Sequence, residues 1–136
     1  MAAHHAACSC EQLRVTVEGD PIRVSMCHCL ACQRRTGSVF GVQARFDATQ
    51  VTIDGDSRQF MRVSDEGDSR AFFHFCPDCG ARVFSTNLDS FPGQVFVTLG
   101  ALDRPELVQP MVEMFNKRRP KWTKPLDIPQ FDSMPG

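Results

Sequence analysis

The 136-residue sequence contains no tyrosine, so it has no phenol that could act as a catalytic acid or stabilise an oxyanion. It has no apolar run of the length needed to cross a membrane. Fifteen basic residues stand against sixteen acidic ones, which leaves a net charge of −1 and no basic footprint for nucleic acid. The start of the chain has neither the charged residues nor the long apolar stretch of a secretory signal. We therefore expect a cytoplasmic protein that binds no membrane and no nucleic acid.

A chain of this length is expected to form one domain over residues 1–136, with its own hydrophobic core. Short segments of alternating apolar and polar residues, such as Leu13-Arg14-Val15-Thr16-Val17, are typical of half-buried strands. Strands are predicted at residues 13–17, 22–26, 39–46, 50–53, 59–63, 70–75, 82–85, 94–99 and 111–115. Helix is scarce, and the best candidate covers residues 30–36 and ends at Gly37. This pattern favours a mainly β fold of short strands, either a sandwich or a partly open barrel.

The two ends of the chain are expected to carry little regular structure. His4 and His5 lie in a stretch of small residues that we expect to be mobile. The tail, residues 120–136, contains four prolines and is expected to follow the surface in extended form. Just before the tail, a short basic run of Lys117, Arg118 and Arg119 is interpreted as a solvated loop rather than a binding patch.

The seven cysteines all lie in short clusters, and an odd number cannot pair fully into disulfides. In a reducing compartment, clustered cysteines are more often metal ligands or redox groups than disulfides. The knuckle Cys76-Pro77-Asp78-Cys79-Gly80 supplies two ligands, and the C-x-C pair of Cys8 and Cys10 is the obvious source of two more. Four thiolates close a structural zinc site. A redox-active dithiol, or cysteines together by chance, are the alternatives.

The remaining triplet, Cys27, Cys29 and Cys32, can reach one ion from a tight turn. Three protein ligands leave a zinc ion with one open position, which can take water or a substrate thiolate. His28 stands between two of these ligands, so its side chain is expected to point away from their metal. The alternative is a closed structural site completed by a distant His, Asp or Glu.

These motifs together resemble the glutathione-dependent formaldehyde-activating enzyme family, also called the GFA or CENP-V/GFA domain. The resemblance covers nearly the whole chain and rests on the C-x-C pair, on the triplet followed by Gln33-Arg34-Arg35-Thr36-Gly37, on the knuckle, and on the tail segments Arg119-Pro120-Lys121-Trp122 and Pro129-Gln130-Phe131-Asp132. It implies an Mss4-like fold, mainly β, of antiparallel sheets organised around zinc. It also implies two zinc ions, a structural one at Cys8, Cys10, Cys76 and Cys79 and a catalytic one at Cys27, Cys29 and Cys32.

The activity that the resemblance implies is that of S-(hydroxymethyl)glutathione synthase, a carbon–sulfur lyase that joins glutathione and formaldehyde. Arg34 and Arg35 follow the triplet and are candidates to contact a carboxylate of glutathione, with a solvated turn as the alternative. The chain departs from the family at Glu11, where glycine is usual, and at Glu113, where histidine is frequent. Glu113 is therefore a candidate general base, and the true substrate is left open.

Other functions are also consistent with a zinc-rich chain. The main rival is a zinc-stabilised module that binds glutathione or a protein partner without turnover. A methionine sulfoxide reductase would need a redox cysteine outside the zinc site, and no cysteine follows Cys79. A zinc-ribbon nucleic-acid binder is disfavoured by the balanced charge.

Overall fold

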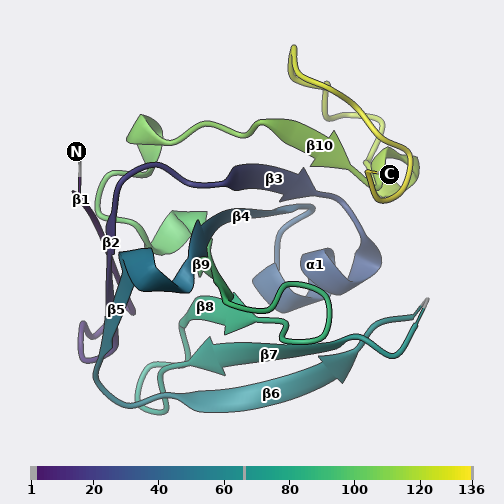
Figure 1. Ribbon diagram of the computed structural model, residues 1–136. Coiled ribbons are helices and arrows are strands. Elements are labelled where there is room, and N and C mark those ends of the chain that lie inside the picture. Colours follow the sequence, from purple (N-terminus) through teal and green to yellow (C-terminus); the bar gives the residue numbers. More distant parts are fainter. Residues whose placement is uncertain (1–2, 66, 136) are drawn as a thin grey trace.

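Strands make up most of the regular structure in this computed structural model, which describes residues 3–65 and 67–135 (Figure 1). The strands are β1 (Ala3–Ala7), β2 (Arg14–Glu18), β3 (Arg23–Cys27), β4 (Gly41–Asp47), β5 (Val51–Asp54), β6 (Arg58–Val63), β7 (Arg70–Phe75), β8 (Arg82–Thr86), β9 (Gln94–Thr98) and β10 (Val112–Met114). The helices are α1 (Leu30–Thr36) and the 3₁₀ turns η1 (Ala48–Gln50), η2 (Leu99–Ala101), η3 (Pro105–Leu107) and η4 (Asn116–Arg118). The predicted mainly β fold with little helix is confirmed. Within residues 3–65 and 67–135, no helix is long and apolar enough to cross a membrane.

The strands form two sheets. The smaller has the order β1-β2-β5, and the larger has the order β10-β3-β4-β9-β8-β7-β6. In Figure 1 the small sheet stands upright on the left, strands of the large sheet lie across the picture, and α1 is on the right. Every strand pair is antiparallel except β10 with β3, which is parallel and sets Met114 beside Cys27. The expectation of antiparallel sheets is therefore wrong for this one pair.

The core lies where the inner faces of the two sheets meet. Strand β2 alternates as its sequence predicts, with Val15 and Val17 buried. The large sheet contributes Val24, Phe46 and Val97, each fully buried. Burying one such side chain stabilises the fold by about 1.5–3 kcal/mol. This core fixes the ends of the strands from which the cysteines project.

The N-terminal stretch forms a strand, so the expectation that it is mobile is wrong over residues 3–7. Strand β1 pairs along its length with β2, and its carbonyl at His5 accepts a hydrogen bond from the Asp103 N–H at 2.8 Å. The ring of His5 is 3.3 Å from Thr16 Oγ1. An Ala-His-His-Ala-Ala segment has neither alternation nor β-branched residues, so only its pairing with β2 makes it a strand.

The helix α1 occupies the residues predicted for it, and its boundaries have local causes. Cys29 is the extended residue just before the helix, and its sulfur accepts the Cys32 N–H at 3.3 Å. The helix ends at Gly37, whose N–H donates to the Gln33 carbonyl at 2.9 Å. Strand β3 leads directly into this turn, so the triplet lies where the sheet changes into helix.

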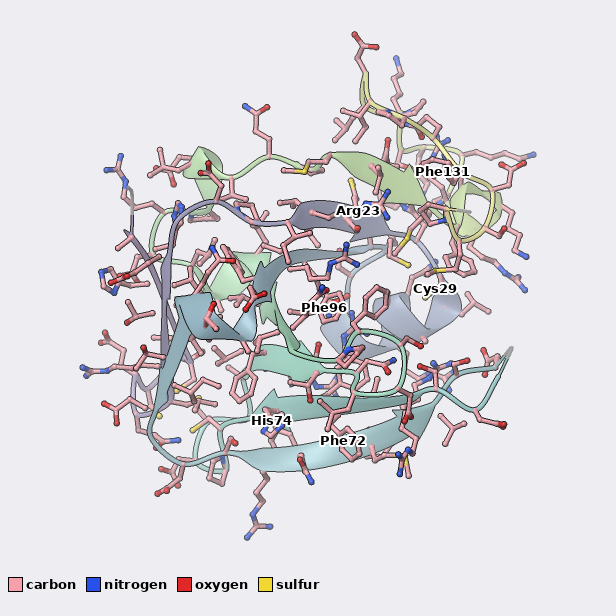
Figure 2. All side chains as sticks on the ribbon, in the orientation of Figure 1. Arg23, Cys29, Phe72, His74, Phe96 and Phe131 are labelled. Carbon is pink, nitrogen blue, oxygen red and sulfur yellow. The ribbon has the colours of Figure 1, made fainter. Side chains whose placement is uncertain are left out.

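The tail consists of turns and bends, and it lies against the outer edge of β10, where Gln130 forms an isolated bridge with Glu113. The Glu113 N–H donates to the Pro129 carbonyl at 3.0 Å, and the Phe131 N–H donates to the Glu113 carbonyl at 2.9 Å. Figure 2 shows Phe131 at the same end of the molecule as Cys29. The tail therefore covers an edge strand that would otherwise expose unpaired backbone groups.

Candidate metal centres

Cys8, Cys10, Cys76 and Cys79 form a first cluster, the four-cysteine cluster, although they come from opposite halves of the chain. Their sulfur atoms all lie within 4.8 Å of one another. The Sγ–Sγ distance is 3.6 Å both from Cys8 to Cys10 and from Cys10 to Cys76, far beyond the roughly 2.05 Å of a disulfide. A tetrahedral zinc ion with Zn–S bonds of about 2.3 Å places its sulfur ligands about 3.8 Å apart. The cluster therefore fits a four-coordinate zinc ion.

Several N–H groups point at these sulfur atoms. The Leu13 N–H donates to Cys8 Sγ at 3.3 Å, and the Asp78 N–H donates to Cys76 Sγ at 3.3 Å. The side-chain amide of Gln12 also donates to Cys76 Sγ, at 3.1 Å. Backbone hydrogen bonds from Ala81 and then Cys10 lower the pKa of Cys79 to about 6. These donors favour thiolates, the form in which cysteine binds a metal.

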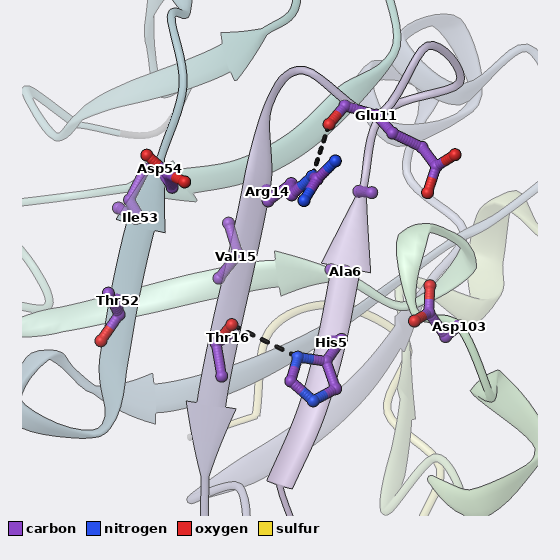
Figure 3. Close-up of a pocket in the computed structure, with 11 residues that line it drawn as sticks. His5, Ala6, Glu11, Arg14, Val15, Thr16, Thr52, Ile53, Asp54 and Asp103 are labelled. Carbon is purple, nitrogen blue, oxygen red and sulfur yellow. Dashed lines mark hydrogen bonds between the residues drawn. The ribbon is translucent and has the colours of Figure 1, made fainter.

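Glu11 lies in the turn after Cys10, and its backbone has a conformation that favours glycine. Its φ of 66° is left-handed, and its N–H donates to the Cys8 carbonyl at 3.0 Å. A cavity of about 500 Å³ lies on the outer face of the small sheet. Figure 3 shows the residues that line it, among which the Glu11 carbonyl accepts from Arg14 Nε at 2.7 Å. The Glu11 carboxylate points away from Arg14 in this view. The presence of glutamate at position 11 therefore affects a turn, and not the group formed by Cys27, Cys29 and Cys32.

Cys27, Cys29 and Cys32 form the second cluster, the three-cysteine cluster. Cys27 ends β3, Cys29 precedes α1 and Cys32 lies in its first turn, so one change of direction brings the three together. Their sulfur atoms lie within 4.8 Å of one another, and within residues 3–65 and 67–135 no fourth His, Cys, Asp or Glu joins them. The cluster can hold a metal ion with three sulfur ligands. The alternative of a closed structural site, completed by a distant His, Asp or Glu, is therefore not supported within these residues.

The three thiols differ in acidity because they share hydrogen bonds. Bonds from Cys27 and from Cys32 lower the pKa of Cys29 to about 2. The bond that Cys27 donates to Cys29 raises the pKa of Cys27 in turn. The guanidinium of Arg35 donates to Cys32 Sγ at 3.4 Å and lies over the Phe73 ring at 4.6 Å. The shared hydrogen bonds thus lower the pKa of Cys29 at the expense of that of Cys27.

Cys27 and Cys29 line a cavity of about 460 Å³, a size typical of small-molecule sites. Its basic residues are Arg62, Lys117 and Arg118. Its apolar residues include Leu30, Ala31, Phe91, Met114, Phe115 and Met134. None of the four-cysteine cluster lines it. The cavity therefore gives a small molecule access to the three-cysteine cluster alone.

The basic residues of this cavity are not those that the sequence predicted. Arg34 is exposed and Arg35 lines a different cavity, so neither is among the lining residues here. Lys117 and Arg118, interpreted above as part of a solvated loop, do line it. The only sequence signal for them was their basic run, whereas nothing in the sequence marks Arg62, which comes from β6.

His28 and Glu113 lie behind the ligands rather than in the cavity. Both are fully buried, and His28 Nε2 is 3.0 Å from Glu113 Oε1. The other carboxylate oxygen accepts the Leu126 N–H and the Gln130 side-chain amide, each at 2.7 Å. Burial raises the pKa of Glu113, but the hydrogen bonds from Gln130, His28 and Leu126 outweigh it and leave the pKa lowered. Glu113 is therefore a buried, hydrogen-bonded carboxylate that does not line the cavity, and the candidate base is set aside.

The sequence profile of the glutathione-dependent formaldehyde-activating enzyme (GFA) family matches residues 3–118. The chain belongs to this family. The matched region contains both cysteine clusters of this GFA chain and ends before the tail. No significant match is found among curated proteins. A crystal structure of a protein from Rhodobacter sphaeroides is similar, with a TM-score of 0.56 and 18% sequence identity over 78% of the GFA chain and 96% of the other. At that identity the likeness supports the fold alone.

Proposed function

We propose that this GFA-family chain is a zinc-dependent enzyme of the carbon–sulfur lyase type. Its substrate would be the adduct of a thiol with a small aldehyde, with glutathione and formaldehyde as the pair. The observation that carries the proposal is the three-cysteine cluster, which offers three sulfur ligands and opens through Cys27 and Cys29 onto a cavity of about 460 Å³. Three protein ligands and one open position are the pattern of catalytic zinc.

The proposal assigns one zinc ion to each cluster. The four-cysteine cluster would hold a structural ion, because four sulfur ligands leave no position for a substrate. At the three-cysteine cluster, a bound zinc ion would lower the pKa of a substrate thiol and so supply a thiolate at neutral pH. Free thiols at all seven positions suit a reducing compartment, and we place the protein in the cytoplasm.

The cavity residues would bind and orient the substrate. Lys117 and Arg118 attract carboxylates such as the two of glutathione. The guanidinium of Arg62 can form a bidentate hydrogen bond with one of these carboxylates. Asp65, which pairs with Arg62 at 3.1 Å, can receive the substrate ammonium. The apolar residues of the cavity limit the access of water. In the direction of synthesis a carbon–sulfur bond forms between thiol and aldehyde, and the thiol proton ends on the new hydroxyl.

Contact between glutathione and Arg34 or Arg35 stays an untested prediction. Arg35 already donates to Cys32 Sγ, so its nearer role is to support the three-cysteine cluster. Arg34 is exposed on the helix surface. Removing the charge of Arg35 should therefore act on the three-cysteine cluster rather than on the carboxylates of the substrate.

The first test is metal content together with exchange kinetics. Elemental analysis should give two zinc ions per chain for the wild type and one for a folded Cys29→Ser variant. Exchange of the formaldehyde carbon between its free and glutathione-bound forms, followed by NMR, should be faster with the wild type than without protein. Cys29→Ser, which keeps the four-cysteine cluster, should return the exchange to the uncatalysed rate. A wild-type rate no faster than the uncatalysed one would reject the lyase, and a fast rate retained by Cys29→Ser would reject the three-cysteine cluster as its site.

A binding module without turnover is the second candidate, and one observation favours it. Among the described residues that line the cavity, the only carboxylate is Asp65, whose side chain is 85% exposed and ion-paired, and there is no histidine. A general base is thus not evident. Glutathione that binds, seen as line broadening of its resonances, with exchange no faster than the uncatalysed rate would favour this candidate over the lyase.

A further inference from the structure

Glu113 joins the tail to the body of the protein through three side-chain contacts and two backbone ones. Its carboxylate accepts from His28, from the Leu126 N–H and from Gln130, at 3.0, 2.7 and 2.7 Å. Its own N–H and carbonyl bond to Pro129 and Phe131 of the tail. No solvent reaches the side chain of Glu113. The tail therefore completes a hydrogen-bonded group around one buried carboxylate.

His28 connects Glu113 to the three-cysteine cluster. It stands between Cys27 and Cys29, and its own backbone is held on both sides. Its N–H donates to the Met114 carbonyl at 3.1 Å, and its carbonyl accepts from the Gln33 side-chain amide at 2.9 Å. The backbone and the imidazole ring of His28 are thus both fixed by hydrogen bonds, and with them the positions of the two ligands on either side of it.

The tail also shapes the cavity wall. Met134 lines the cavity directly. The Phe115 N–H donates to the Ser133 carbonyl at 3.2 Å, and Phe115 has a left-handed φ of 57°. That left-handed conformation is unfavourable for an L-residue, and it turns the chain from β10 toward Lys117 and Arg118. The tail is thus hydrogen-bonded to the strained turn that directs Lys117 and Arg118 to the cavity.

We propose that residues 126–134 are part of the functional site, with Glu113 as the positioning residue that links them to the three-cysteine cluster. The tail holds Glu113, Glu113 holds His28, and His28 fixes the spacing of Cys27 and Cys29. This part of the chain lies outside the region matched by the family profile, which ends at residue 118. The inference rests on the metal that the proposed function assigns to the three-cysteine cluster, but it does not require turnover.

The expected effect is selective for one of the two metals. In Glu113→Gln, the charge-assisted hydrogen bonds of the carboxylate become weaker neutral ones, and the amide keeps its contact with His28 only if the ring changes tautomer so that Nε2 accepts. Residues that support metal ligands typically contribute 10–100-fold to metal affinity. We expect a loss of about this size at the three-cysteine cluster and no change at the four-cysteine cluster. A merely structural role would weaken both sites together.

The test uses the full chain loaded with Co²⁺ alone, whose thiolate absorption reports on each site. Cys29→Ser identifies which absorption belongs to the three-cysteine cluster. A competing chelator then measures the affinity of each site in the wild type, in Glu113→Gln and in Gln130→Ala. Gln130 is exposed, so its truncation should leave the fold intact. The control is Asp127→Asn, an exposed tail residue with no side-chain hydrogen bond in the described part of the chain.

Early release of Co²⁺ from the three-cysteine cluster alone, in Glu113→Gln and more weakly in Gln130→Ala, supports the inference. Release from both clusters in parallel, or unchanged release from both, overturns it. If Glu113→Gln does not fold, Gln130→Ala decides by the same criteria. A wild type that binds Co²⁺ only at the four-cysteine cluster also overturns it. A wild type that binds at both clusters without catalysing exchange rejects the lyase and leaves the inference standing.

Discussion

Replacing Gly55 with alanine should destabilise the protein strongly, because Gly55 lies against the loop that carries Cys8 and Cys10. Gly55 has a φ of +98°, and a Cβ on it would lie 2.0 Å from the Gln12 carbonyl oxygen and 3.0 Å from Leu13 Cα. Both sides of this contact are backbone, so rotating a side chain cannot relieve it. The left-handed conformation costs alanine about 1–2 kcal/mol, and separating the two segments adds about 1–3 kcal/mol. The expected loss of about 2–5 kcal/mol is a large part of the roughly 5–15 kcal/mol of a typical domain.

Urea unfolding followed by far-UV circular dichroism measures this loss. Fluorescence is unsuitable, since Trp122 is the only tryptophan and is 75% exposed. The matched control is Gly93→Ala, where φ is +74° but a Cβ would meet nothing within 4 Å. The control should lose only the conformational part, about 1–2 kcal/mol. Equal losses in the two variants would show that the contact with Gln12 is absent, and would refute the reasoning.

Four further outcomes follow from the same structure. Cys76→Ser should abolish cooperative thermal unfolding by circular dichroism, because binding of a structural zinc ion is folding free energy. Glu11→Gly should raise the free energy of unfolding in urea by about 0.5–1 kcal/mol, since it removes left-handed strain at a φ of 66°. The double variant Lys117→Ala, Arg118→Ala should weaken glutathione binding by calorimetry at low salt and less at high salt, because salt screens exposed charges. The pKa of Glu113 is lowered in the folded state, so its contribution to stability is complete above the ordinary carboxyl pKa and is lost as pH falls through the lowered value. The difference in unfolding free energy between the wild type and Glu113→Gln should therefore shrink on acidification, and a constant difference would contradict the assigned hydrogen bonds.

Sequence patterns predicted most of the local structure because local causes decide it. Strand β7 and helix α1 have the predicted boundaries, since the β-forming phenylalanines favour the first and the Cys29 and Gly37 ends set the second. Strand β1 was missed because nothing within its own sequence favours a strand. The parallel pairing of β10 could not be read either, because it depends on how the chain returns to β3 after more than half of its length.

The cysteine groups were predictable because spacing limits which sulfur atoms can meet. The cavity was not predictable, because its cations come from β6 and from the turn after β10, which are distant in sequence. Arg35 stands near the triplet in sequence, yet its helical position directs it to Cys32 and to Phe73. Glu113 was a candidate base by its position, but the tail covers it, and this covering is a long-range contact that no local pattern reports.

The way the two clusters are distributed along the chain has a consequence for biosynthesis. Cys10 and Cys76 are 66 residues apart, so at about 5–20 residues per second a ribosome takes roughly 3–13 s to make the second after the first. Throughout that interval Cys8 and Cys10 lack the other two ligands of their site, Cys76 and Cys79. The triplet, by contrast, is complete within a single turn and can take up metal as soon as it emerges. The nascent chain should therefore acquire its metals in a fixed order, with the ion proposed for chemistry first and the ion that closes the fold last.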